Sequence, residues 1–227
     1  MKKLIALLLA VLMVASLAAC GTSGDGGSGS ADVAEEVDYS SMTLEELKAE
    51  IKTVNEGKLT VATSPDFAPY EFYALNDNNE PTLAGFDVAL AQYIADQLGL
   101  ELDIIPMDFD GTISELGNKT VDLGLAGYSP DPERESLMNF SDLYYKGGQS
   151  FVTVNAKADE MTSMEVANDA KYQIGAQVGS IQVDLAKQNT PDADIVELTK
   201  VTDIIAELLA GTLDGAFIET AVAESYQ

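Results

Sequence analysis

The chain has 227 residues, with 12 Lys and Arg against 38 Asp and Glu, a formal net charge of −26 and no histidine. The negative electrostatic field of such a chain repels phosphate backbones, which argues against a nucleic-acid-binding protein. The lack of histidine and the single cysteine exclude His-containing catalytic triads, His-based zinc sites and redox motifs built on two cysteines. We therefore expect no metal and no cofactor. The length suits one large domain or two small ones.

The first twenty residues have the composition of a secretory signal. Two lysines precede an apolar run that ends at Val14 and is followed by small residues. The run is too short and too close to the start for a transmembrane span. Cys20 closes the sequence Leu-Ala-Ala-Cys, which resembles a bacterial lipobox. The resemblance implies removal of residues 1–19 and lipidation of Cys20; the alternative is an incidental free thiol.

Two short regions separate the signal from the main body. Residues 20–42 are rich in Gly and Ser, which predicts a flexible tether. Residues 43–57 are predicted to form a leader helix docked on the body, or alternatively a helix that binds a partner. Thr43 and Glu46 fit a capping box, and Gly57 fits a C-terminal stop. The apolar positions at helical spacing are Leu44, Leu47, Ile51 and Val54.

From Lys58 onward, short strands alternate with helices. The expected strands are 59–63, 102–107, 121–127, 150–154, 172–178, 194–198 and 214–219. The expected helices are 85–100, 111–119, 181–189 and 201–211. This alternation predicts an α/β fold with mainly parallel sheets, in which ligands gather at the carboxyl ends of strands. We place lobe 1 at residues 58–147 and lobe 2 at residues 148–227.

Several motifs occur in a characteristic order. The first half contains "VATSPDFAPYEF", "GFDVALAQYIADQLGL" and "AGYSPDPERE", and the second half contains "YQIGAQVGSIQVDLA" and "LLAGTLDGAFIETAVAESY". From Leu59 to Gln227 the chain resembles the amino-acid-binding proteins of ABC importers, the polar-amino-acid group of family 3. The resemblance implies a two-lobe, periplasmic-binding-protein-like fold of type II with the ligand cleft between the lobes. It also implies a free amino acid as ligand and a membrane permease as partner.

Arg134 is the only arginine in the chain and follows a Ser-Pro-Asp-Pro sequence. The resemblance implies that it pairs with the α-carboxylate of the ligand, while Ser129 donates its backbone N–H. A guanidinium is a planar fork suited to a carboxylate, which supports this role independently. Asp131 and Pro132 are predicted to be the N-cap and first residue of a helix. The alternative is a surface ion pair with a neighbouring glutamate.

The resemblance assigns further ligand-binding positions in lobe 1. Phe67 takes the aromatic place that covers the ligand side chain, and Phe109 takes the apolar place opposite it. Ala126 and Gly127 stand where relatives often have serines, so only their backbone groups are expected to hold the ligand's amino group. Each of the two phenylalanines alone would more often be a core residue.

In lobe 2, the resemblance assigns a helix start and an acidic strand end. Ser180 and the N–H of Ile181 are expected to receive the carboxylate, and Glu219 the α-ammonium. A glutamate at that position could instead be solvated. An enzyme is the alternative function: a prephenate-type dehydratase on the same fold, with Glu219 as general acid. A sensory domain fused to a signalling module is disfavoured by the length.

The pocket walls predict a neutral polar ligand such as glutamine or cystine. Basic-amino-acid receptors place an acid where this chain has Ser64, and Asp66 is expected to face solvent. The aromatic walls then offer only the hydroxyl of Tyr128, and a buried cationic head without a counter-charge is costly. The alternative is that Glu71 or Asp108 turns inward and supplies the charge.

Family members continue for several tens of residues beyond "AVAESY" and return to lobe 1, whereas this sequence stops at Gln227. We expect either a fragment or a lobe 1 without its last elements. The overall expectation is a monomeric, extracytoplasmic receptor, anchored to the bacterial cell membrane through lipid on Cys20.

Overall fold

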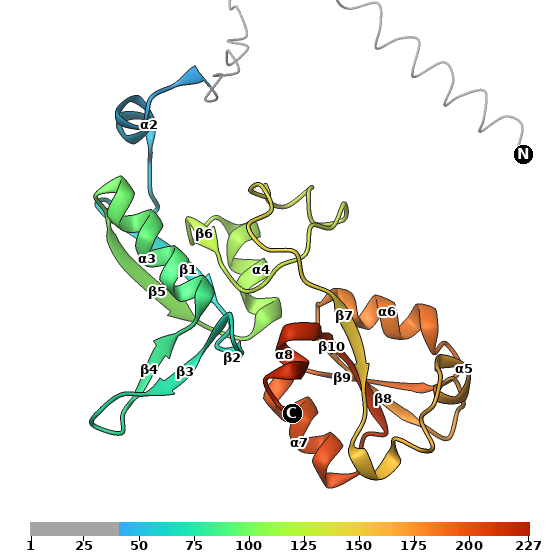
Figure 1. Ribbon diagram of the computed structural model, residues 1–227. Coiled ribbons are helices and arrows are strands. Elements are labelled where there is room, and N and C mark those ends of the chain that lie inside the picture. The colour runs from blue at the N-terminus through green and yellow to red at the C-terminus, as the bar shows by residue number, and fades with distance from the viewer. Residues whose placement is uncertain (1–40) are drawn as a thin grey trace, which may run out of the picture. The chain divides into compact units, whose positions relative to one another are not determined.

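The computed structural model describes residues 41–227 (Figure 1). The predicted signal peptide, Cys20 and most of the predicted tether lie outside these residues. The chain divides into two units, Met1–Leu47 and Lys48–Gln227, and each is considered by itself. Within residues 41–227, no helix combines the length and the apolar character needed to cross a membrane.

The first helix, α2 (Leu44–Glu50), begins with the predicted capping box. The N–H of Thr43 donates to Glu46 Oε2 at 2.8 Å, and the N–H of Glu46 donates to Thr43 Oγ1 at 3.4 Å. These reciprocal bonds satisfy two N–H groups that have no partner inside the helix. The capping box is confirmed.

The prediction that this helix continues to Gly57 is wrong, because α2 ends at Glu50. The N–H of Val54 donates to Asp122 Oδ1 at 2.7 Å, and Asp122 Oδ2 accepts from the N–H of Thr60 at 2.8 Å. A carboxylate distant in the sequence thus takes a donor that a continuing helix would need. Asp122 ties the segment to the start of the body.

Lobe 1 has a parallel sheet of order β5-β1-β6. Its elements are β1 (Lys58–Thr63), α3 (Phe86–Leu98), β5 (Glu101–Pro106), α4 (Phe109–Asn118) and β6 (Leu123–Gly124). Buried Ala91 and Ala95 of α3 pack with Leu59 and Val61 of β1, so small side chains bring helix and strand close. The strand predicted over 121–127 is observed only as the two residues of β6. The backbone leaves the extended conformation by Gly127, whose φ is 58°.

A second, antiparallel sheet of order β2-β3-β4 was not predicted. Its strands are β2 (Asp66–Phe67), β3 (Glu71–Leu75) and β4 (Pro81–Ala84). The Asn76 side chain closes the connection between β3 and β4 by accepting from the N–H groups of Asn78 and Glu80, each at 2.9 Å. The run Asn-Asp-Asn-Asn after alternating residues was the available signal for this hairpin.

Lobe 2 has a four-stranded sheet of order β7-β10-β8-β9. Strands β10, β8 and β9 are parallel, and β7 pairs antiparallel with β10. The predicted helices 181–189 and 201–211 are observed nearly to the residue. The elements are β7 (Gln149–Val152), η2 (Asn155–Lys157), α5 (Met164–Ala167), β8 (Gln173–Gln177), α6 (Ile181–Asn189), β9 (Asp194–Leu198), α7 (Val201–Ala210), β10 (Gly215–Glu219) and α8 (Thr220–Glu224).

The core of lobe 2 lies on both faces of this sheet. Ala216 and Ile218 of β10 pack in a cluster with Ile204 of α7, whereas Phe217 between them packs with Ala186 of α6. Because successive strand residues point to opposite faces, α6 and α7 cover opposite sides of the sheet. Within residues 41–227, no strand pairing joins the sheets of the two lobes. The predicted α/β class and two-lobe architecture are confirmed.

Candidate functional site

Arg134 lies in a turn that begins at Asp131. The Asp131 carboxylate accepts from the N–H of Glu133 at 2.9 Å, and its carbonyl accepts from the N–H of Arg134 at 3.0 Å. Such local side-chain to backbone bonds compete with a regular helix. No helix begins at Pro132, so the predicted N-cap and first helical residue are wrong. The turn nevertheless fixes the backbone from which the guanidinium extends.

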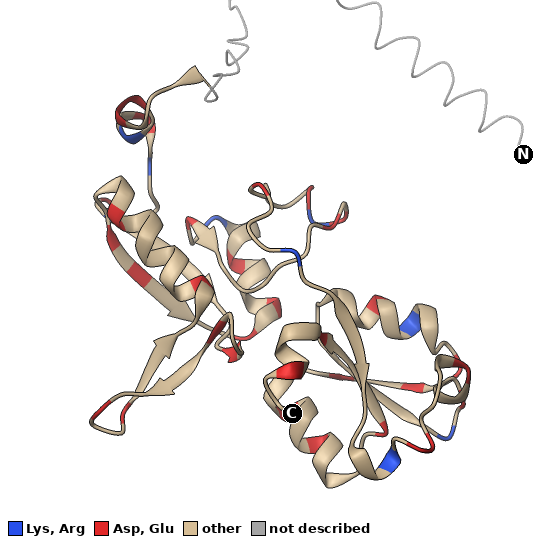
Figure 2. Cartoon of the chain, viewed as in Figure 1, with Lys and Arg blue, Asp and Glu red and all other residues tan. Residues whose placement is uncertain are grey.

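The Arg134 side chain is a buried cation in a chain with few cations. Figure 2 shows how few Lys and Arg positions lie among the acidic ones. The residue is 8% exposed, and its Nη2 donates to the carbonyl of Gly179 at 2.8 Å. Its Nε lies 3.9 Å from Asp131 Oδ2. The ion-pair partner is thus an aspartate, and not one of the neighbouring glutamates that the alternative interpretation named. A guanidinium has five N–H donors, so the contacts with Gly179 and Asp131 leave donors for a further acceptor.

One aromatic ring adjoins the guanidinium, and a second packs against the first. The Arg134 guanidinium carbon lies 5.8 Å from the ring centroid of Phe109, the first residue of α4, within the range of a cation–π contact. Phe109 in turn meets the ring of Tyr128, with centroids 5.4 Å apart. The Tyr128 hydroxyl donates to Thr112 Oγ1. The Tyr128 proton is therefore taken by a neighbouring threonine, and the acceptor lone pairs of its oxygen are what remains for a ligand.

Phe67 and Gly127 form a second close contact. Phe67 is 8% exposed and stacks on Tyr70, with ring centroids 5.6 Å apart. A Cβ on Gly127 would lie 2.7 Å from Phe67 Cε1, so the glycine makes room for the ring. Ala126, just before it, is also buried. Serine at position 127 would displace Phe67, which explains why only the backbone is available there.

The start of α6 brings lobe 2 to Arg134. Gly179, with φ 73°, presents its carbonyl to the guanidinium. Ser180 is the N-cap of α6, but its side chain makes no cap hydrogen bond; its hydroxyl donates to the Gln177 carbonyl at 2.6 Å. The N–H of Ile181 is the first of this helix. A helix N-terminus with unused N–H groups favours an anion.

Glu219 is buried, not solvated: the residue is 6% exposed at the end of β10. Its Oε2 accepts from the N–H of Val222 at 2.9 Å and so caps α8. Its Oε1 is buried without a hydrogen-bond partner among residues 41–227. An unpaired carboxylate oxygen suits a cationic ligand group.

Ser64 and Asp66 differ from expectation. Ser64 is buried and donates to Asp66 Oδ1 at 2.7 Å. Asp66 is only 9% exposed, so its predicted exposure to solvent is wrong. The reason lies far along the chain, because Asp66 Oδ2 accepts from the N–H of Val201 at 2.6 Å and from Gln177 Nε2 at 3.3 Å. Burial raises the pKa of Asp66, while the bonds from Ser64 and Val201 lower it.

Glu71 and Asp87 are two buried acids; the sequence offered the inward turn of Glu71 as an alternative, and it gave no sign that Asp87 is buried. Glu71 is fully buried, and neither of its carboxylate oxygens has a partner among residues 41–227. Burial, then the charges of Asp87 and Asp66, raise the pKa of Glu71 well above its ordinary value. Asp87 Oδ2 accepts from the N–H of Gly127 and from the Tyr144 hydroxyl, each at 3.0 Å. Asp87 is therefore a positioning residue for the turn at Gly127.

Of the two residues suggested as an inward counter-charge, Glu71 does point inward and Asp108 does not. The Asp108 side chain is 49% exposed, with its Oδ1 3.9 Å from Lys200 Nζ.

A cavity of about 380 Å³ adjoins part of this arrangement. Four of the predicted ligand-binding residues line it together with Tyr70: Gly127, Tyr128, Ser129 and Glu219. Phe67, Phe109, Arg134, Ser180 and Ile181 do not line it. The structure thus groups Arg134 with Phe109, Tyr128 and the start of α6, groups Phe67 with Gly127, and connects Glu219 to Ser129 through the cavity. Ser64 belongs to a separate cluster around Asp66.

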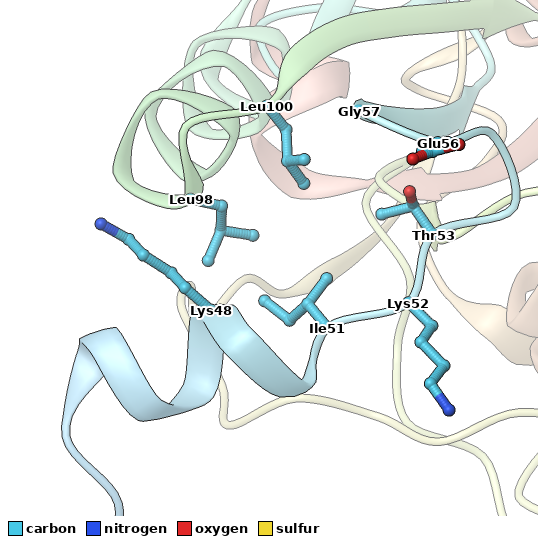
Figure 3. A pocket seen from close by; sticks show the side chains of 8 residues that line it. All are labelled: Lys48, Ile51, Lys52, Thr53, Glu56, Gly57, Leu98 and Leu100. Atoms are coloured by element: carbon cyan, nitrogen blue, oxygen red, sulfur yellow. The ribbon is translucent and has the colours of Figure 1, made fainter.

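A second cavity, of about 260 Å³, contains none of the predicted site residues. Figure 3 shows Ile51, Leu98 and Leu100 directed into a common space, with the Lys52 amine pointing away from it. Within residues 41–227, no group of three or more Cys, Asp or Glu residues could hold a metal ion.

Comparisons with known proteins show what the chain is similar to. The model of the bacterial extracellular solute-binding proteins, family 3, matches residues 59–214. The arginine-binding extracellular protein ArtP of Bacillus subtilis is 36% identical over 172 residues, which are 74% of this chain and 64% of ArtP. The crystal structure of the amino acid ABC transporter substrate-binding protein AbpA from Streptococcus pneumoniae, bound to L-arginine, has a TM-score of 0.72 and 33% identity. The superposed region covers 75% of this chain and 71% of the AbpA chain.

One relative is an enzyme. The cyclohexadienyl dehydratase of Pseudomonas aeruginosa is 24% identical over 163 residues, which are 72% of this chain and 59% of the enzyme. The chain therefore spans about three fifths of the length of these two curated relatives, ArtP and the dehydratase.

Proposed function

Because the chain belongs to the bacterial extracellular solute-binding proteins of family 3, we propose that it captures a free amino acid and delivers it to the permease of an ABC importer. It acts as a receptor and not as an enzyme. We place it outside the cytoplasm, anchored through lipid on Cys20.

The observation that carries this proposal is the environment of Arg134. The only arginine of a very acidic chain is 8% exposed and adjoins the start of α6 in the other lobe. Burying a cation is costly unless an anion or several acceptors satisfy it. Among residues 41–227, the Arg134 guanidinium has one hydrogen bond, to Gly179, and one long ion pair, with Asp131 at 3.9 Å. An α-carboxylate placed between Arg134 and the N–H of Ile181 satisfies the remaining donors. Glu219, with its unpaired Oε1, then receives the α-ammonium.

For the ligand side chain we propose a cation of the arginine class. The argument for a neutral ligand assumed that Asp66 faces solvent, and Asp66 is buried. Asp66 and Glu219 are thus two buried acids against a single buried cation among residues 41–227, Arg134. A cationic ligand offsets this excess better than a neutral one. The B. subtilis relative is named as arginine-binding, and the S. pneumoniae structure contains L-arginine, which supports the same choice.

Competition binding tests both the receptor role and the choice of a cationic ligand. We expect labelled arginine to bind saturably and to be displaced by unlabelled arginine at concentrations at least about tenfold lower than by glutamine or cystine. Lysine is the matched comparison, since it keeps the charge and lacks the planar fork. Equal or stronger competition by glutamine or cystine contradicts the cationic ligand and leaves the receptor role intact. If none of the twenty amino acids or cystine binds in a thermal-shift screen, the receptor role itself is wrong.

A further inference from the structure

Asp66 connects the two lobes. It lies in β2 of lobe 1, and its carboxylate accepts hydrogen bonds from two groups of lobe 2: the N–H of Val201 at 2.6 Å and Gln177 Nε2 at 3.3 Å. The bonding atoms are buried, so water competes little for them. The Ser64 hydroxyl holds the other oxygen at 2.7 Å and so fixes the direction of the carboxylate.

The partner on lobe 2 is a helix start that lacks a cap of its own. Helix α7 has ten residues, Val201–Ala210, and its N-cap residue is Lys200, whose side chain makes no cap hydrogen bond. The lysine side chain has only hydrogen-bond donors, so it cannot accept from the N–H groups at the helix start. Asp66 supplies the acceptor and the negative charge that favour a helix N-terminus. A residue of lobe 1 therefore caps a helix of lobe 2.

We propose that Asp66 is a closure residue: by capping α7 across the cleft it holds the lobes together and slows release of the bound amino acid. This inference rests on the proposed receptor function. Asp66 acts through α7, so it is a positioning residue and not a ligand contact. Removing it should leave association nearly unchanged and accelerate dissociation, since affinity changes within one interface fall mainly on the off-rate.

A second interlobe contact provides a matched control. Asp108 of lobe 1 lies 3.9 Å from Lys200, the residue next to Val201, and both side chains are about half exposed. Exposed ion pairs contribute little because solvent screens them. Asp108→Ala thus removes a carboxylate near the same helix start, without removing the cap.

The experiment compares Asp66→Ala, Val201→Pro, their combination and Asp108→Ala in the full chain. Proline is tolerated at the first position of a helix and deletes the N–H that Asp66 accepts, and Lys200 before it is already extended, with φ −123° and ψ 139°. Because Val201 is buried, the single variant Val201→Pro also reports the effect of changing this side chain. The release of labelled arginine is followed after addition of excess unlabelled arginine. We expect release to be about tenfold faster, or more, in Asp66→Ala, unchanged in Asp108→Ala, and no faster in the double variant than in Asp66→Ala.

Hydrogen exchange at the Val201 amide separates this inference from the receptor function. We expect exchange at this amide to be faster in Asp66→Ala than in the unchanged protein, with or without arginine, and unaffected by Asp108→Ala. Unchanged release and unchanged exchange in Asp66→Ala, or additive effects in the double variant, overturn the closure role. If the unchanged protein binds no amino acid while the exchange result holds, the interlobe cap stands. The receptor function and the release role then fail.

Discussion

Replacing Arg134 with alanine is expected to weaken amino-acid binding by about 2–5 kcal/mol, which is well over tenfold in Kd. The substitution removes the fork that receives the α-carboxylate, and it leaves the ligand's negative charge buried among other acids. Because the α-carboxylate is common to all amino acids, the loss should be similar for arginine and for any weaker competitor. Isothermal titration calorimetry with arginine measures it.

Two comparison variants make this test specific. Arg134→Lys keeps the charge but loses the planar fork and the contact with Phe109, so an intermediate loss is expected. Lys187→Ala removes an exposed cation from α6, whose partner is Glu197 at 3.0 Å, and should leave Kd unchanged. Circular dichroism and the melting temperature establish that each variant is folded. A folded Arg134→Ala protein with unchanged calorimetry removes Arg134 from the binding site.

Replacing Gly85 with alanine is expected to destabilise the fold by more than about 3 kcal/mol. Gly85 precedes α3 with φ 123° and ψ 175°, a backbone region that residues other than glycine rarely adopt. Its added Cβ would also lie 2.1 Å from the Tyr70 carbonyl oxygen, which is backbone and cannot swing aside. Urea denaturation measures the change in the free energy of unfolding.

Gly117 provides the control for that substitution. It lies within α4, and a Cβ there meets no atom within 4 Å. Gly117→Ala should therefore stabilise the protein by about 0.5–1 kcal/mol, because alanine is the better helix former. Equal denaturation midpoints for Gly85→Ala and the unchanged protein contradict the close approach at Gly85.

Features that depend on neighbouring residues could be predicted from the sequence. Apolar spacing located α6 and α7 nearly to the residue, and the capping box of Thr43 and Glu46 formed as expected. Composition drew attention to Arg134 as the only arginine of the chain, and the family resemblance supplied its expected role. For the helices and the capping box the relevant interactions are local.

Features that depend on contacts between distant residues could not be predicted. Asp66 follows a strand and precedes an aromatic residue, which gives no sign that Val201, 135 positions later, buries its carboxylate. The early end of α2 depends in the same way on Asp122, which is 68 residues beyond Val54. The prediction of a neutral ligand relied on the position of Asp66, because it counted Asp66 as a solvated charge.

The burial of Glu71 and Asp87 makes the proton itself a ligand of the folded state. Burial raises the pKa of both carboxyl groups, most strongly for Glu71, which Asp87 and Asp66 also face. In the unfolded chain both groups titrate near about pH 4. The folded state therefore binds protons more tightly than the unfolded state. The stability that these two groups contribute is fully present below their unfolded pKa values and is lost as the pH rises through their raised folded values. Acidification, which unfolds many proteins by protonating paired carboxylates, thus acts in the opposite direction at this pair.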